Sequence, residues 1–438
     1  MIGPLRPFIS NIGNAIRSGL SIKDAVTTAA SLFPEATGFF DWDPSTFGLK
    51  SDLLFAKNDS INSFLFRNRI SGKKVSINQL TEEEARNIGE TILLLDQSNC
   101  KQDVIERCPY QNFIQGIFEA GIFAEDFVET NWKLEPPQIG ITRLQHSSFL
   151  LKTSKASVIV DPHFVSGYSS HLTDASLMLP RNFNGLIEAV LITHSHTDHY
   201  HVPSLMMLPR DTFMIVPRVQ DETILSPDFG RELRNMGFQN VIELDWYSDP
   251  FIIGDIEISA FPFYGEQPLR YEYPRDKKLR NYGNSYFFRT PNFSAFCLID
   301  SGSDADGSMI EVAESLKQQF GSVDVILSNL QKFYVGVGCG NPFYVTGGGF
   351  YWLSLTPDQI ARFPQMSDHL LTLGPEGVAE ICQITNAKTF LPYSHLWSEI
   401  GTSPPREDSM LQALNRVPGM SGSKTEIVNW RIGDSWLP

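Results

Sequence analysis

The sequence has no long apolar run, few cysteines and fewer basic than acidic side chains. None of its 438 residues falls in a stretch of roughly eighteen consecutive apolar residues, so no membrane-spanning helix is expected. The five cysteines are odd in number and show no C-x-x-C spacing, which favours free thiols in a reducing compartment. The first residues do not form a basic region followed by an apolar one, so we expect a cytoplasmic protein without an export signal.

The formal net charge of −15 argues against a nucleic-acid partner. Proteins that bind phosphate backbones normally carry basic patches. The most basic stretch, residues 270–280, also contains Glu272 and Asp276. We interpret it as a solvated loop near the functional site, where a small basic patch would steer an acidic partner protein.

Four metal-competent side chains lie within six positions: His194, His196, Asp198 and His199. They follow the apolar run 189–192, which is typical of a buried strand. Side chains two positions apart in an extended chain point to the same side, so His194 and His196 are expected to share one metal. Asp198 and His199 come after the chain turns and can reach a second point. The loop therefore predicts two metal ions about 3.5–4 Å apart.

This H-x-H-x-D-H motif, and the segments around it, resemble the metallo-β-lactamase fold superfamily over roughly residues 138 to 438. Residues 140–151 and 157–163 resemble the opening hairpin of that fold, where Asp161 is expected to brace the metal loop through hydrogen bonds. The strand that ends at Asp300 matches the place of the metal-bridging aspartate, and the strand that ends at His395 matches the last ligand of the second metal. The resemblance implies an αββα sandwich of two mixed sheets with helices outside.

The chain lacks a histidine between positions 201 and 369, where hydrolases of the superfamily usually carry a third histidine on the first metal. A predicted strand at 255–263 occupies that place and runs into Tyr264, Gly265 and Glu266. Glu266 is the natural replacement ligand. With Asp198 and Asp300 it gives the pair three carboxylates, and such anionic oxygen donors favour iron over zinc, which has no redox chemistry.

One branch of the superfamily shows the same exchange of histidine for glutamate: the di-iron oxygenases that β-hydroxylate an aminoacyl precursor. The resemblance implies that His194, His196 and Glu266 bind the first iron, that Asp198, His199 and His395 bind the second, and that Asp300 bridges them. It also implies O2 as co-substrate, an external electron donor, and a substrate that is a small molecule or an amino acid on a carrier protein. Of the other histidines, we expect His146 and His163 to contact ligands or substrate, and His201 to lie at the surface or behind the ligands.

Two other readings stay open at this point. The first is a dinuclear zinc or manganese hydrolase, in which a metal-bound hydroxide attacks a lactone, ester or phosphodiester. The second is a metal-binding scaffold without catalysis, which the seven candidate ligands argue against, because packed acids and histidines are costly unless a metal compensates them.

Residues 1–137 contain no catalytic constellation. Short predicted strands at 61–66 and 70–80 precede a helix that opens with a capping box at Thr81 and Glu84 and runs to about residue 97. We interpret residues 1–137 as a smaller α+β domain, winged-helix-like, for docking or for forming a homodimer. Residues 135–138, which include a Pro-Pro pair, are the predicted linker.

The stretch 331–355 alternates aromatic residues with glycines between Asp300 and His395. This composition favours a loop that approaches a ligand or moves, and we interpret it as a lid or a wall of the substrate pocket. Tyr264 and Tyr334 are the polar aromatic residues expected nearest to the metals, and they are the candidate catalytic side chains.

Overall fold

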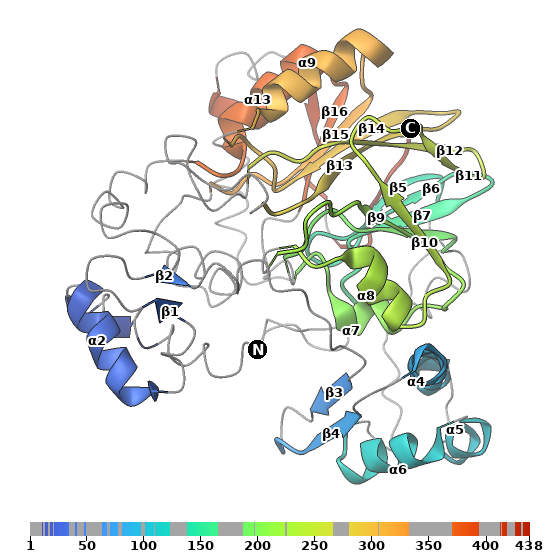
Figure 1. The fold of residues 1–438 in the computed structure, drawn as a ribbon. Helices are drawn as coiled ribbons and strands as arrows, with labels where there is room; N and C mark the ends of the chain where they lie inside the picture. Colours follow the sequence, from blue (N-terminus) through green and yellow to red (C-terminus); the bar gives the residue numbers. More distant parts are fainter. Residues whose placement is uncertain are drawn as a thin grey trace.

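A computed structural model shows the fold (Figure 1). It describes residues 11, 14–15, 18–20, 22–34, 40–41, 48–49, 64–67, 71–77, 81–97, 101–108, 110–122, 138–164, 187–196, 198–223, 226–265, 280–304, 306–332, 370–393, 412, 414–417, 425–430 and 432–438. The two seven-stranded sheets of this part of the chain lie in its C-terminal two thirds.

The first sheet has the strand order β10-β9-β8-β7-β6-β5-β18. The antiparallel hairpin of β5, β6 and β7 confirms the predicted opening of the domain, and β8, β9 and β10 continue the sheet in parallel with β7. The strand β18 near the C-terminus pairs antiparallel with β5. The bounds are β5 Gly140–Arg143, β6 Phe149–Lys152, β7 Ser157–Val160, β8 Ala189–Leu191, β9 Phe213–Pro217, β10 Asn240–Leu244 and β18 Ser435–Trp436.

The second sheet has the order β11-β12-β13-β14-β15-β16-β17. Its first four strands are antiparallel and its last four, from β14 on, are parallel, so both sheets are mixed as predicted. The bounds are β11 Phe251–Ile253, β12 Ile256–Pro262, β13 Asn284–Arg289, β14 Ser294–Ile299, β15 Val325–Ser328, β16 Thr389–Pro392 and β17 Glu426–Ile427.

Hydrophobic side chains fill three layers around these sheets. One buried cluster lies between the sheets and joins residues such as Phe149 and Leu191 of the first to Ile258 and Tyr286 of the second. A second cluster lies under α7 (Val202–Leu205) and α8 (Phe229–Asn235), and a third lies under α9 (Met309–Phe320) and α13 (Gly374–Thr385). Two sheets with helices on both outer faces form the αββα sandwich that the sequence predicts (Figure 1).

Helices of the N-terminal region share the second cluster with the first sheet. Ile88 of α4 (Glu82–Gln97) and Phe113 of α6 (Gln111–Glu119) are buried together with Ile159 of β7 and Met214 of β9. The capping box predicted at Thr81 is present, because its backbone N–H donates to Glu84 at 2.8 Å and its hydroxyl accepts from the Glu84 N–H at 3.2 Å. Also described here are α2 Ile22–Leu32, β1 Phe40–Asp41, β2 Gly48–Leu49, β3 Phe64–Arg67, β4 Lys74–Ile77 and α5 Lys101–Arg107.

The short strands β3 and β4 fall on the two segments where the sequence predicts short strands, and they pair as an antiparallel hairpin. Residues 131–137, with most of the predicted linker, lie outside the described residues. The boundary at residue 137 and the docking or dimerisation role therefore stay predictions. Among the described helices, none is long and apolar enough to cross a bilayer. The described cysteines Cys108, Cys297 and Cys382 are free thiols, as expected.

Candidate metal centre

The metal-competent loop begins where β8 ends. This strand lies between β7 and β9 and is parallel to both, so the loop emerges at the carboxyl edge of the first sheet. The carbonyl of His196 accepts the backbone N–H of His199 at 2.9 Å and that of Tyr200 at 2.7 Å. This turn carries the chain back, so that Asp198 and His199 face the histidines that precede them, as the spacing predicts.

His194 and His196 offer neighbouring nitrogens. Nε2 of His194 lies 3.1 Å from Nδ1 of His196, and the His194 ring stacks on Phe263 with centroids 4.8 Å apart. Burial lowers the pKa of both imidazoles below the ordinary value. Both rings are therefore neutral near pH 7, which is the form that binds a metal.

Asp300 reaches the loop from the second sheet. It follows β14, whose register shifts between Cys297 and Ile299, and Ile299 has a positive φ of 59°. A bulge of this kind redirects the strand end. Oδ2 of Asp300 then lies 3.0 Å from Nε2 of His199, and the side chain of Asn329 donates to Oδ1.

Asp161 holds the other side of His199. Its Oδ2 lies 2.7 Å from Nδ1 of His199, and its Oδ1 accepts the backbone N–H of Thr193 at 2.8 Å. The Thr193 hydroxyl also donates to Oδ2 at 2.6 Å. The structure confirms that Asp161 braces the loop, and the contact with Nδ1 leaves Nε2 of His199 for the metal.

The buried carboxylates and imidazoles of the cluster would be stabilised by a bound cation. Burial opposes the charged form of His199, but the carboxylates of Asp198 and Asp300 raise its pKa well above the ordinary value. Burial likewise opposes ionisation of Asp198, yet the charge on His199 and the hydrogen bond from His146 hold its pKa well below the ordinary value. Buried carboxylates and imidazoles at hydrogen-bond spacing are costly unless a positive ion compensates them. Two overlapping sets of donors meet this need: His194, His199 and Asp300, and His146, Asp198 and His199. The donor chemistry therefore fits a dinuclear metal centre.

Five of the seven predicted ligands come together in this cluster: His194, His196, Asp198, His199 and Asp300. Glu266 and His395, with the candidate catalytic Tyr334 and residues 333–355 of the predicted lid, lie outside the described residues. The residues directly before Glu266, up to Gly265, are described. There the Gly302 N–H donates to the Tyr264 carbonyl at 2.6 Å, which ties that segment to the one after Asp300.

The Tyr264 ring packs against Trp246 and Arg280. It lies edge-on to Trp246 with centroids 5.5 Å apart and joins the cluster under α9. The Arg280 guanidinium lies 5.6 Å from its centroid. None of the described contacts of this ring involves a metal-competent side chain, so its catalytic role stays a prediction.

The structure corrects the prediction that residues 270–280 form a solvated basic loop, because Arg280 at its end is buried. Its side chain is 5 % exposed, donates to Asp304 at 3.1 Å and forms an ion pair with Asp306 at 2.5 Å. It also donates to the Phe263 carbonyl at 2.8 Å. Arg280 therefore braces the segment before Glu266 and is not available to steer a partner. The residues from 270 to 279 lie outside the described part of the chain.

Other residues near the centre carry weak signals in the sequence. Asn329 follows β15, the parallel neighbour of β14, and a polar residue at such a strand end is the only signal that could have found it. His201 is buried, with Nδ1 2.7 Å from the Ser204 hydroxyl, and it stacks on His163 at 4.1 Å. It lies behind the ligands, and the surface alternative for it was wrong.

Comparison with known proteins agrees with this fold. Residues 140–287 match the family model described as the Beta-lactamase superfamily domain. Over 81 residues the chain is 35 % identical to 4-amino-L-phenylalanyl-(CmlP-peptidyl-carrier-protein) 3-hydroxylase of Streptomyces venezuelae, which is 18 % of this chain and 15 % of that protein.

Among solved structures, the chain resembles CmlA, a diiron beta-hydroxylase from Streptomyces venezuelae. The TM-score is 0.53 at 18 % identity, over 82 % of this chain and 63 % of CmlA, so the chain spans under two thirds of that protein. It also matches the isothiocyanate hydrolase from Delia radicum gut bacteria, with a TM-score of 0.42 at 15 % identity over 66 % of this chain and 96 % of the hydrolase. At this identity the likeness to CmlA shows the fold alone.

Proposed function

Because this chain has the metallo-β-lactamase fold and resembles the di-iron β-hydroxylase branch of that superfamily, we propose that it is a dinuclear-iron oxygenase. It would use O2 to hydroxylate or otherwise oxidise its substrate. The observation that carries the proposal is the convergence of buried imidazoles and carboxylates from both sheets, at His194, His199 and Asp300. Glu266 in place of a third histidine supports iron over zinc, because carboxylate oxygen stabilises the harder metal.

The ligands divide between two ions in this proposal. His194, His196 and Glu266 would hold the first iron, and Asp198, His199 and His395 would hold the second. Asp300 would serve both ions. Its place supports this, because it meets His199 at the point where the two sets of donors overlap. When bound, the two irons supply the binding and reduction of O2, with electrons from an external donor.

The residues of the chain itself prepare the site for this chemistry. Asp161 orients His199, and Asn329 orients Asp300. The neutral His194 and His196 add no positive charge, so a bound cation would take the place of the proton on His199 as the charge that balances Asp198 and Asp300. The ordered donors keep their geometry without reorganisation, which is the contribution that a protein makes to a metal site.

The substrate that we propose is an amino acid tethered to a carrier protein. Its support is the 35 % identical relative, a 3-hydroxylase of a 4-amino-L-phenylalanyl group held by a peptidyl-carrier protein. The matched stretch covers 15 % of that relative, so the side chain and position that are oxidised form part of the proposal and need direct assay.

Metal content and oxygen response test the proposal together. The protein would be loaded anaerobically with ferrous iron, and metal per chain and the visible spectrum would be measured before and after O2. We expect about two irons per chain, a spectral change after reduction and O2, and mass gain of one oxygen on a carrier-bound amino acid. Asp300→Asn is the control that removes the bridge and should lose all three. Two zinc or manganese ions with no oxygen response would instead favour a lactone, ester or phosphodiester hydrolase.

A further inference from the structure

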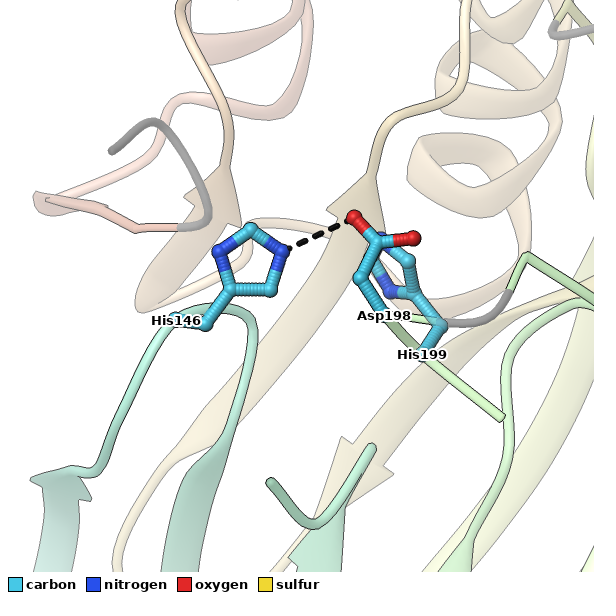
Figure 2. Close-up of side chains that lie close together, drawn as sticks. All are labelled: His146, Asp198 and His199. Atoms are coloured by element: carbon cyan, nitrogen blue, oxygen red, sulfur yellow. Dashed lines mark hydrogen bonds and ion pairs between the residues drawn. The ribbon is translucent and has the colours of Figure 1, made fainter. Parts of the chain in front are cut away.

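We propose that His146 is an additional ligand of the second metal, beside Asp198 and His199. This residue lies outside the H-x-H-x-D-H motif, because it comes from the turn between β5 and β6, about fifty positions before the metal-competent loop. Figure 2 shows its ring directed at the Asp198 carboxylate, with His199 on the other side. The inference rests on the proposed dinuclear centre, but it does not depend on the metal being iron.

The donor atoms have the spacing of ligands. Nε2 of His146 lies 3.0 Å from Oδ2 of Asp198, and Nε2 of His199 lies 3.8 Å from the same oxygen. The three donors lie within 4.8 Å of one another. Two ligand atoms that are each about 2.1 Å from one ion and at right angles to each other are about 3.0 Å apart. A cation bound here would replace the proton that His146 and Asp198 share.

The backbone of His146 is held in a conformation that histidine rarely adopts. Its φ is +50°, in the left-handed region, and its side chain is only 7 % exposed. A tight turn keeps it there, because the Ser148 N–H donates to the Gln145 carbonyl at 2.9 Å. Such strain in a residue other than glycine persists where the surroundings enforce it, and it gathers at functional sites. Glycine would relieve the strain, so a histidine here indicates a use for the imidazole.

The turn is also built against the metal-competent loop. The Ser147 hydroxyl donates to the Asp198 carbonyl at 3.2 Å, so two successive side chains of the turn contact one ligand residue. On its far side His146 meets the edge of His163 with centroids 5.9 Å apart, and His163 stacks on His201. These contacts hold the His146 ring against the Asp198 carboxylate, with its centroid 5.8 Å from that of His199.

Binding of Co²⁺ to the metal-free full chain tests the role, because cobalt reports its ligands by visible absorption. The wild type should bind two ions per chain. His146→Gly removes the imidazole and suits the positive φ, so this variant should still fold without metal, as a cooperative thermal transition would show. Its second site should weaken at least about tenfold, with an altered cobalt spectrum, and free imidazole should restore both. Asn386 also has a φ of 50° but lies at the end of α13, so Asn386→Gly is the matched control and should bind like wild type.

His146→Asn separates a ligand from a hydrogen-bond partner. Asparagine tolerates the left-handed region and keeps an N–H for Asp198. If His146 ligates, this variant should lose the second site as the glycine variant does. Wild-type affinity and spectrum in His146→Asn, or two tightly bound ions in His146→Gly, would overturn the inference while leaving the dinuclear centre intact. A wild type that binds fewer than two ions would instead count against the proposed function itself.

Discussion

Nδ1 of His199 lies 2.7 Å from a carboxylate oxygen of Asp161, and this contact sets which nitrogen of the ring faces the metal centre. Asp161 also accepts two hydrogen bonds from Thr193, so one buried carboxylate fixes both the start of the metal-competent loop and the ligand near its end. Metal-binding histidines generally depend on such a partner.

Asp161→Asn should therefore weaken metal binding about 10–100-fold while leaving the fold intact. Asparagine suits the φ of 44° at this position, but as a neutral acceptor it supports His199 less strongly. Metal affinity by titration and thermal melting of the metal-free protein measure the two effects. Asp324→Asn is the matched control, since Asp324 also accepts a backbone N–H, from Ser294, but at the start of β14. Equal affinities in both variants would contradict the role of Asp161.

Glu266→His should change the metal that the site prefers. A third imidazole at the first metal removes one anionic oxygen and produces the donor set of the zinc hydrolases, so zinc should replace iron and the response to O2 should disappear. Metal analysis after growth with both metals, with oxygen uptake on the same samples, measures this. Glu266→Gln separates loss of charge from gain of imidazole and should bind less of either metal. Unchanged iron content in Glu266→His would remove Glu266 from the ligand set.

Asp304→Asn should destabilise the protein by about 3–5 kcal/mol, because it leaves the buried Arg280 guanidinium without its most buried partner. The same change should lower metal content, since Asp304 also accepts the Gly265 N–H at 3.0 Å, next to Glu266. Chemical denaturation and metal analysis measure the two effects. Asp306→Asn is the comparison, because Asp306 is 27 % exposed and its loss should cost clearly less. Equal losses in the two variants would show that burial of the pair is not what matters.

Gly89→Ala should destabilise the protein by about 1–3 kcal/mol, although alanine is the better helix former. The added Cβ of α4 would lie 1.9 Å from Nε of Arg210. Arg210 cannot move freely, because it donates to the carbonyls of Leu208 and Met206 and lies over the Phe238 ring. In Gly116→Ala on α6 the nearest atom, of Val75, is 3.4 Å away, so that variant should be stabilised by about 0.5–1 kcal/mol. A neutral Gly89→Ala would mean that α4 does not pack on the first sheet in solution.

Because of Glu232, the free energy of unfolding should fall as pH rises from about 4.5 to about 6. Burial, with the charge of Glu222, raises its pKa from 4.5 to about 6. The folded protein therefore holds this proton more tightly than the unfolded chain, and ionisation above that range opposes folding. Glu232→Gln should flatten the profile in this window and add up to about 2 kcal/mol at pH 7. Denaturant unfolding across pH measures this, with Glu314→Gln on the exposed side of α9 as control. A profile that Glu232→Gln leaves unchanged would contradict the buried-carboxylate account.

The sequence alone determined the elements whose signals are local. The apolar run of β8 and the capping box at Thr81 follow from residues a few positions apart, and the hairpin of β5 to β7 follows from the resemblance to the superfamily. All three appear in the structure. The motif at His194 to His199 could also be identified, because four ligands of one site lie next to one another in the chain. Asp300 could be placed through the resemblance to the superfamily, because it ends a strand at the place of the metal-bridging aspartate.

Tertiary structure alone decided the contacts between distant parts of the chain. The approach of His146 to Asp198, the burial of Arg280 between two carboxylates and the packing of α4 on the first sheet have no local pattern. The pairing of Ser435 with Thr142 likewise joins the two ends of the catalytic domain. Each contact depends on how the sheets twist and stack. That packing fixes the neighbours of a side chain but produces no periodic pattern in the sequence around it. A buried arginine and a loop arginine look the same in a sequence, because burial is a property of the surroundings and not of the residue.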